Sequence, residues 1–138
     1  MGKFKILLAD DSCAIRTALQ GLLLPESDHW TVCGEATDGR GAIEKAAELC
    51  PDVILLDLSL PIISGLNVAQ ILNQDYPQIE VILMSAQDPL TMSLLAKAAG
   101  VSYVIPKSHL VERLVPMLSS LRVEFEKQGR HSHTPTKA

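Results

Sequence analysis

The stretch Val53-Ile54-Leu55-Leu56-Asp57 is the most hydrophobic short run of the chain, and it ends on an acid. Polar and apolar residues do not alternate within it, which is typical of a parallel strand that is covered on both faces. We therefore predict that residues 53–56 form a central strand and that Asp57 stands at its carboxyl end.

Four further short apolar runs flank this one, and a helical pattern follows each of the five. The runs cover residues 5–9, 31–37, 79–84 and 102–105. The helical patterns are bounded by Ser12 and Pro25, by Gly39 and Pro51, by Ser64 and Asn73, by Pro89 and Gly100, and by Leu110 and Phe125. This alternation predicts an α/β fold, (βα)5, with a doubly wound parallel sheet in the flavodoxin-like order 2-1-3-4-5.

The length and composition suit one domain with a compact core. The chain has 138 residues, of which 47% are hydrophobic and 20% are charged. We expect the domain to cover residues 1–126, and residues 127–138 to be a disordered tail, a linker stub or residues added for expression, because they show no apolar period. Pro116 lies inside the last helical pattern, so we expect that helix to kink or to begin later.

The charge and the distribution of apolar residues exclude several classes of partner. The net charge is −4 and no run of Lys or Arg occurs, which argues against direct binding of nucleic acid. The longest uncharged stretch, residues 58–74, contains Pro61 and several polar residues, so we expect no membrane span. No signal-peptide core follows Met1, and we expect a cytoplasmic location.

Polar residues stand at the carboxyl ends of four of the predicted strands. They are Asp10 and Asp11, Asp57, Ser85 and Lys107. Doubly wound sheets bind ligands beyond the carboxyl ends of their strands, and the order 2-1-3-4-5 places the first strand beside the third. We therefore expect the three carboxylates to share one pocket with the hydroxyl and the ammonium group.

These residue types favour a metal and a phosphoryl group. Three neighbouring carboxylates repel one another, and a hard divalent cation such as Mg²⁺ relieves that repulsion. Lys107 and Ser85 suit phosphoryl oxygens, as a positive charge and as a hydrogen-bond donor. Asp57 is alone on its strand and is the natural nucleophile, which leaves Asp10 and Asp11 to hold the metal.

Each residue also has an ordinary structural explanation. An acid before a helix is often an N-cap, a lysine is usually a solvated charge, and serine is common in turns. Their joint placement at the ends of the first, third, fourth and fifth strands favours a functional site.

With these residues in place, the sequence resembles the receiver domain of bacterial two-component response regulators over about residues 4–122. The resemblance is carried by residues 6–12, Asp38-Gly39, residues 51–61, Gly65, Ser85-Ala86, Ala99-Gly100 and Lys107-Ser108. Residues 34–36 and Lys107-Ser108 most resemble the subclass that is usually fused to a helix-turn-helix DNA-binding domain. A stand-alone receiver and the receiver portion of a longer regulator both stay open, and the tail favours the second.

The resemblance implies that Asp57 accepts a phosphoryl group from the phosphohistidine of a sensor histidine kinase or from a phosphotransfer protein. Asp11 would ligate Mg²⁺ directly, Asp10 would ligate it largely through water, and Asp57 and the backbone carbonyl of Ser59 would be further ligands. Ser85 would hydrogen-bond the phosphoryl group, and Lys107 would pair with it.

The resemblance also implies an output surface. Phosphorylation would switch the face made by the fourth helix, the fifth strand and the fifth helix, which would signal to an output domain or partner and allow a homodimer. The domain would not be an enzyme beyond catalysing its own phosphorylation and dephosphorylation. Ser59 and Gln87 would flank the water path and tune the lifetime of the phosphoryl group.

Two departures from the family pattern keep alternatives open. An aromatic switch residue often stands three positions before the lysine, where this chain has Val104, and the neighbouring Tyr103 faces the other side of the strand. A proline commonly follows the lysine, whereas here Pro106 precedes Lys107. A receiver fold that signals through constitutive contacts is therefore a second hypothesis.

A flavin carrier or an aspartyl-phosphate phosphatase is a third hypothesis, and both versions fit the residues less well. The acids after the first strand have the wrong charge for a flavin phosphate. A phosphatase would need a second acid at position 59, where this chain has a serine.

Overall fold

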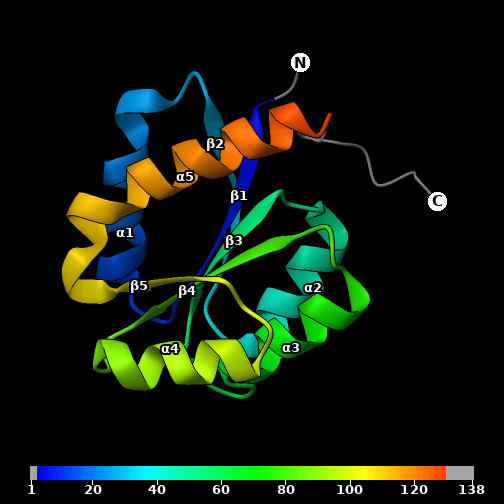
Figure 1. Ribbon diagram of the computed structural model, residues 1–138, viewed down its shortest axis with the longest axis vertical. Helices are drawn as coiled ribbons and strands as arrows, with labels where there is room; N and C mark the ends of the chain where they lie inside the picture. The colour runs from blue at the N-terminus through cyan, green and yellow to red at the C-terminus, as the bar shows by residue number, and fades with distance from the viewer. Residues whose placement is uncertain (1–2, 130–138) are drawn as a thin grey trace.

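The computed structural model describes residues 3–129 and contains five strands that alternate with five α-helices (Figure 1). The strands are β1 (Phe4–Ala9), β2 (Trp30–Ala36), β3 (Val53–Asp57), β4 (Glu80–Ser85) and β5 (Tyr103–Pro106). The α-helices are α1 (Cys13–Leu23), α2 (Gly39–Leu49), α3 (Gly65–Asp75), α4 (Pro89–Ala98) and α5 (Leu110–Lys127). Two short 3-10 helices, η1 (Leu24–Glu26) and η2 (Lys107–His109), complete the described part of the chain.

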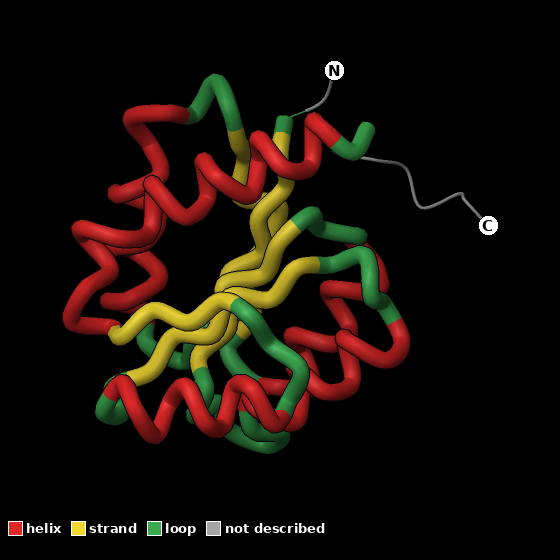
Figure 2. The backbone as a smooth tube through the Cα atoms, viewed as in Figure 1, coloured by secondary structure: helices red, strands yellow, loops and turns green. Residues whose placement is uncertain are grey.

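The strands form one parallel sheet in the order β2-β1-β3-β4-β5. Figure 2 shows this twisted sheet in yellow between the red helices. β3 lies in the middle of the sheet, and every residue of β3 is buried, as its uninterrupted apolar run predicts. The predicted doubly wound fold and its strand order are confirmed.

The helices cover both faces of the sheet (Figure 1). Helices α1 and α5 pack on one face, and α2, α3 and α4 pack on the other. Because side chains alternate along a strand, Val53 and Leu55 belong to the core under α1 and α5, whereas Ile54 and Leu56 belong to the core under α2, α3 and α4. Helices on both faces leave the carboxyl edge of the sheet as the place where strand ends and loops meet.

Side-chain caps start four of the helices directly beyond this edge. Ser12 Oγ accepts a hydrogen bond from the backbone N–H of Ile15, as its predicted capping role requires. The other three N-caps are Asp38, Ser64 and Asp88. Pro89 lies in the first turn of α4 as predicted, and Gly100, which has a φ of +79°, follows the end of that helix.

Glycine allows α3 to begin close to the end of β3. A Cβ atom on Gly65 would lie 1.9 Å from the carbonyl oxygen of Asp57. The loop between β3 and α3 also contains Ile62, which has a φ of +72° and an exposed side chain. A left-handed backbone is unfavourable for a β-branched residue, so Ile62 is a strained position in this loop.

Helix α5 runs through Pro116 and begins at Leu110, so the expectation of a later start is wrong. The buried side chains of Leu110, Leu114, Leu118 and Leu121 lie on the apolar side of the helix. Burial of this stripe outweighs the loss of one backbone hydrogen bond at Pro116.

Among the described residues, no helix is both long and apolar enough to cross a membrane. Residues 130–138, most of the expected tail, lie outside the described part.

Candidate functional site

Asp57 is the last residue of β3, and its side chain is almost completely buried at the carboxyl edge of the sheet. Its Oδ1 atom accepts a hydrogen bond of 3.2 Å from the backbone N–H of Ser59. Burial raises the pKa of Asp57 above its ordinary value, and the charge of Asp10 adds to this, while the Ser59 N–H and Lys107 oppose it. The site therefore holds a carboxylate whose charge needs a partner.

Asp10 and Asp11 follow β1 and bring two more carboxylates to Asp57. Asp10 is fully buried and its Oδ1 atom accepts a hydrogen bond of 2.9 Å from the backbone N–H of Ser12, whereas Asp11 is exposed. One carboxylate oxygen from each of the three residues lies within 4.8 Å of the others. This all-oxygen donor set, open to solvent on the side of Asp11, fits a hard divalent cation such as Mg²⁺.

Lys107 begins η2 directly after β5 and reaches across the edge of the sheet to two of these acids. Its Nζ atom lies 2.9 Å from Asp10 Oδ2 and 3.4 Å from Asp57 Oδ1. Partial burial by itself lowers the pKa of Lys107, but the hydrogen bond with Asp10 and the charges of Asp57 and Asp10 outweigh it, so the pKa is raised. The lysine is therefore a firmly charged ammonium group inside the acidic cluster.

Ser85 ends β4, the strand beside β3, and its side chain is buried. It follows Met84, which pairs with Asp57, and it pairs in turn with Pro106, the residue before Lys107. Its Oγ atom accepts a hydrogen bond of 2.9 Å from the backbone N–H of Gln87. The exposed residues Ser59 and Gln87 thus contribute backbone N–H groups that hold Asp57 and Ser85.

Arg16, a residue of α1 that was not predicted from the sequence, touches this site through the backbone. Its Nη1 atom donates a hydrogen bond of 2.8 Å to the carbonyl oxygen of Asp10, and its Nε atom donates one of 2.7 Å to Glu35 Oε1. No local motif in the sequence indicates this contact, because it joins α1 to the segment after β1 and to β2.

Tyr103 and Val104 lie on opposite sides of β5, as the alternation along a strand predicts. Tyr103 packs against the core covered by α1 and α5, whereas Val104 packs against the core covered by α2, α3 and α4. The aromatic ring therefore does not take the place of the residue at position 104. All peptide bonds between residues 3 and 129 are trans, including the bond after Lys107.

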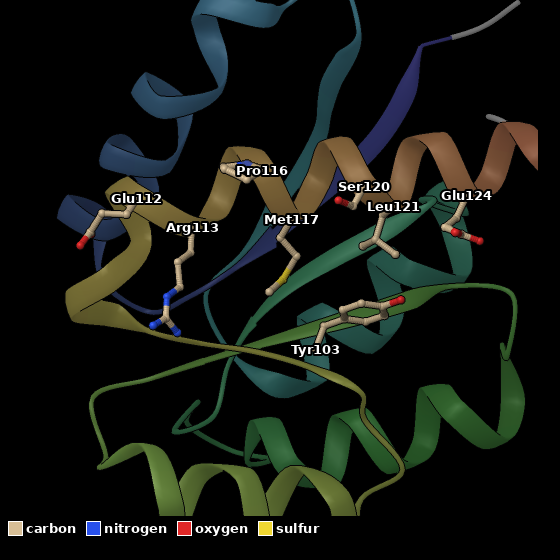
Figure 3. A pocket seen from close by; sticks show the side chains of 8 residues that line it. All are labelled: Tyr103, Glu112, Arg113, Pro116, Met117, Ser120, Leu121 and Glu124. Carbon is tan, nitrogen blue, oxygen red and sulfur yellow. The ribbon is translucent and has the colours of Figure 1, made fainter.

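A groove outside the acidic cluster runs between β5 and α5 (Figure 3). It has a volume of about 430 Å³, and Tyr103 from β5 faces a row of side chains from α5. That row consists of Glu112, Arg113, Pro116, Met117, Ser120, Leu121 and Glu124. The floor of the groove is apolar, and charged residues stand at both of its ends.

The fold and the site together define a class of protein: a doubly wound α/β domain with acids, a hydroxyl group and a lysine at one sheet edge, suited to a divalent cation and a phosphoryl group. The family model of the response regulator receiver domain matches residues 6–119. The chain belongs to this family, whose members are signalling domains of two-component systems.

Similar proteins support this assignment. The chemotaxis protein CheY of Thermotoga maritima is 31% identical over 121 residues, which cover 88% of this chain and 98% of CheY. The response regulator GacA of Pseudomonas syringae is 32% identical over 126 residues, 90% of this chain and 56% of GacA. The chain thus spans nearly all of one relative and about half of the other.

Solved structures give the same result. The receiver domain of AraT from Geobacillus stearothermophilus has a TM-score of 0.83 at 26% identity, covering 94% of this chain and all of that domain. Response regulators of the LuxR and NarL types are also among the similar structures. The resemblance seen in the sequence is therefore confirmed.

Proposed function

We propose that this receiver is a phosphoacceptor switch in which Asp57 takes a phosphoryl group from the phosphohistidine of a sensor histidine kinase or a phosphotransfer protein. An Asp57 carboxylate oxygen would attack phosphorus, and the bond between phosphorus and the histidine nitrogen would break. The imidazole would be the leaving group, and Asp57 would carry the phosphoryl group as an acyl phosphate. The observation that carries the proposal is the buried Asp57 carboxylate, within reach of two other acids and a lysine.

Asp10, Asp11, Asp57 and the backbone carbonyl of Ser59 would hold Mg²⁺. The main electrostatic obstacle to phosphoryl transfer here is the repulsion between the carboxylates and the phosphoryl oxygens, which are both negative. The ion would supply positive charge that offsets this repulsion. The fit of the all-oxygen donor set supports this choice of metal.

Lys107 and Ser85 would act on the phosphoryl group itself. The Lys107 ammonium contacts Asp57 Oδ1 at 3.4 Å, so it can also reach an oxygen of a group attached to that carboxylate. The Ser85 hydroxyl already accepts a hydrogen bond from Gln87 N–H, and its own proton is suited to a phosphoryl oxygen. In the proposed switch, these two residues transmit the change to β4 and β5.

The output surface would be the face around α4, β5 and α5, through which the domain could meet a partner or a second copy of itself. Leu90 and Leu94 on α4 and Val111 on α5 are large apolar side chains that are more than half exposed. The groove in Figure 3 adds an apolar floor to the same face. Exposed apolar side chains on α4 and α5, together with the apolar groove beside β5, support an interaction surface on these elements.

Intact-mass analysis after incubation with acetyl phosphate tests the proposal. We expect the wild type to gain one phosphoryl mass in the presence of Mg²⁺ and to gain none when the metal is chelated. Asp57→Asn should gain nothing, whereas Asp75→Asn, a matched change of an exposed acid at the end of α3, should behave as the wild type. Equal phosphorylation of Asp57→Asn would refute the assignment of the acceptor.

A receiver fold that signals through constitutive contacts is the second candidate function. The position of Tyr103, on the opposite side of β5 from position 104, favours it. If the wild type gains no phosphoryl mass from acetyl phosphate or from a phosphorylated histidine protein, this candidate replaces the first. In both cases we propose that residues 1–126 form the receiver and that residues 127–138 belong to a tail or linker.

A further inference from the structure

Arg16 contacts the backbone between the two acids that follow β1. Its Nη1 atom donates a hydrogen bond of 2.8 Å to the carbonyl oxygen of Asp10. That oxygen belongs to the peptide group that joins Asp10 to Asp11. Because a peptide group is planar, a hydrogen bond that holds its oxygen also fixes the direction in which Asp11 leaves it.

The residue Asp10 is held at several other atoms, whereas Asp11 is not comparably enclosed. The Asp10 N–H donates to Ala36 O at 3.1 Å, and its two carboxylate oxygens meet Ser12 N–H and Lys107. Asp11 is exposed, although its carboxylate belongs to the acidic cluster. The orientation of the peptide before Asp11 is therefore an important restraint on where that carboxylate lies.

Glu35 on β2 holds the Arg16 side chain in this orientation. The Nε atom of Arg16 lies 2.7 Å from Glu35 Oε1, and Gln20 Nε2 donates to the other oxygen of Glu35. The Arg16 side chain is 16% exposed, so it is largely packed between α1 and the sheet. A guanidinium group donates from separate nitrogens in a rigid plane, here Nη1 and Nε, so it can join two acceptors that the single nitrogen of an ammonium group would not reach in the same arrangement.

We propose that Arg16, held by Glu35, is a positioning residue of the divalent-cation site that presents the Asp11 carboxylate to the ion. The inference rests on the proposed metal binding at Asp10, Asp11 and Asp57. Arg16 contacts none of the carboxylate oxygens of the acidic cluster and acts only through the backbone carbonyl of Asp10. Removal of such an outer partner typically weakens metal binding by ten- to a hundredfold.

The sign of the effect separates this role from simple electrostatics. Arg16 carries a positive charge close to a cation site, so its removal should strengthen cation binding if charge alone mattered. A positioning role predicts the opposite, because a displaced Asp11 carboxylate no longer meets the ion at the right distance. The conservative variant Arg16→Lys keeps the charge and loses the two-acceptor geometry, so it should also weaken binding.

Isothermal titration calorimetry with Mg²⁺ on the unphosphorylated chain measures this directly. We expect Arg16→Met to raise the Kd for Mg²⁺ about tenfold and Arg16→Lys to raise it by a smaller factor. The matched control is Arg122→Met on α5, which removes an arginine that pairs with Glu126 at 3.0 Å and should leave the Kd unchanged. Phosphorylation by acetyl phosphate should recover in Arg16→Met when Mg²⁺ is raised in proportion.

The outcomes separate this inference from the proposed function. A wild type that binds Mg²⁺, together with Arg16 variants whose Kd is unchanged or lower, would overturn the positioning role and leave the metal site intact. A wild type that binds no Mg²⁺ would overturn both. If Arg16→Met fails to fold, Arg16→Lys decides the question, since charge alone predicts no change for that variant.

Discussion

Gly65, the first residue of α3, is one of two described glycines, with Gly39, at which an added methyl group would clash directly with backbone atoms. The methyl carbon of Gly65→Ala would lie 1.9 Å from the carbonyl oxygen of Asp57 and 2.8 Å from the Cα atom of Leu58. Both contacts are with backbone atoms, so a rotation of a side chain cannot relieve them. The start of α3 would have to move by about 1 Å from the end of β3.

We expect Gly65→Ala to lower the free energy of unfolding by about 3 kcal/mol, at the upper end of the cost of overpacking a tight site. For a domain of this size, this corresponds to a fall in Tm of about 10 °C. The same movement would displace Asp57 and Leu58, so the rate of phosphorylation by acetyl phosphate should fall as well.

Urea denaturation followed by tryptophan fluorescence is a suitable assay. The chain has one tryptophan, Trp30, which is 2% exposed and belongs to the core covered by α1 and α5, so its emission reports unfolding. Gly21→Ala is the matched control, because a Cβ atom there meets nothing within 4 Å and the position lies inside α1. This control should be more stable than the wild type by about 0.5–1 kcal/mol.

The two alanine variants differ only in position, so opposite signs are the essential result. If the free energy of unfolding of Gly65→Ala lay within about 1 kcal/mol of the wild-type value, the close approach of α3 to β3 would not constrain the site. The steric reasoning would then be refuted.

Two further predictions concern Asp57 and the groove. The raised pKa of Asp57 means that the folded state binds this proton more tightly than the unfolded state does, so metal-free wild type should lose stability as the pH rises from the ordinary aspartate value through the raised one. Asp57→Asn should lack this loss. The free energy of unfolding of both proteins, measured by urea denaturation from acidic to neutral pH, checks this. If it depended on pH in the same way in both, the raised pKa of Asp57 would be contradicted. In α5, Arg113 and Glu124 are separated by about three turns and lie on the same side of the helix. If two copies met through antiparallel α5 helices, Arg113 of each copy would therefore lie beside Glu124 of the other. Arg113→Glu and Glu124→Arg should each weaken self-association, and an equimolar mixture of the two should restore it in sedimentation velocity, whereas a mixture that stays monomeric would exclude this arrangement.

The sequence predicted where these residues would lie, because parallel strands deliver their carboxyl ends to one edge. Asp10, Asp57, Ser85 and Lys107 each stand at or directly after the end of a strand, so knowledge of the strands and their order was enough to bring them together. The opposite faces of Tyr103 and Val104 likewise follow from the alternation of side chains along a strand.

Contacts that depend on side-chain reach or on strand register could not be predicted in this way. Arg16 meets Glu35, 19 positions along the chain, only because of how α1 lies on β1 and β2, where the register also shifts between Ile6 and Leu7. The course of α5 through Pro116 is another case, because local propensity opposes it and only the energy of the packed core explains it.

The position of Lys107 determines what phosphorylation can change. Its ammonium group already bridges Asp10 and Asp57, and thereby ties the segment after β5 to the ends of β1 and β3. A phosphoryl group on Asp57 would therefore exchange one set of partners of this lysine for another rather than give an idle residue its first partner. The energy available for signalling is the difference between two competing attachments, so weakening the resting attachment at Asp10 would make the same phosphoryl group a stronger signal.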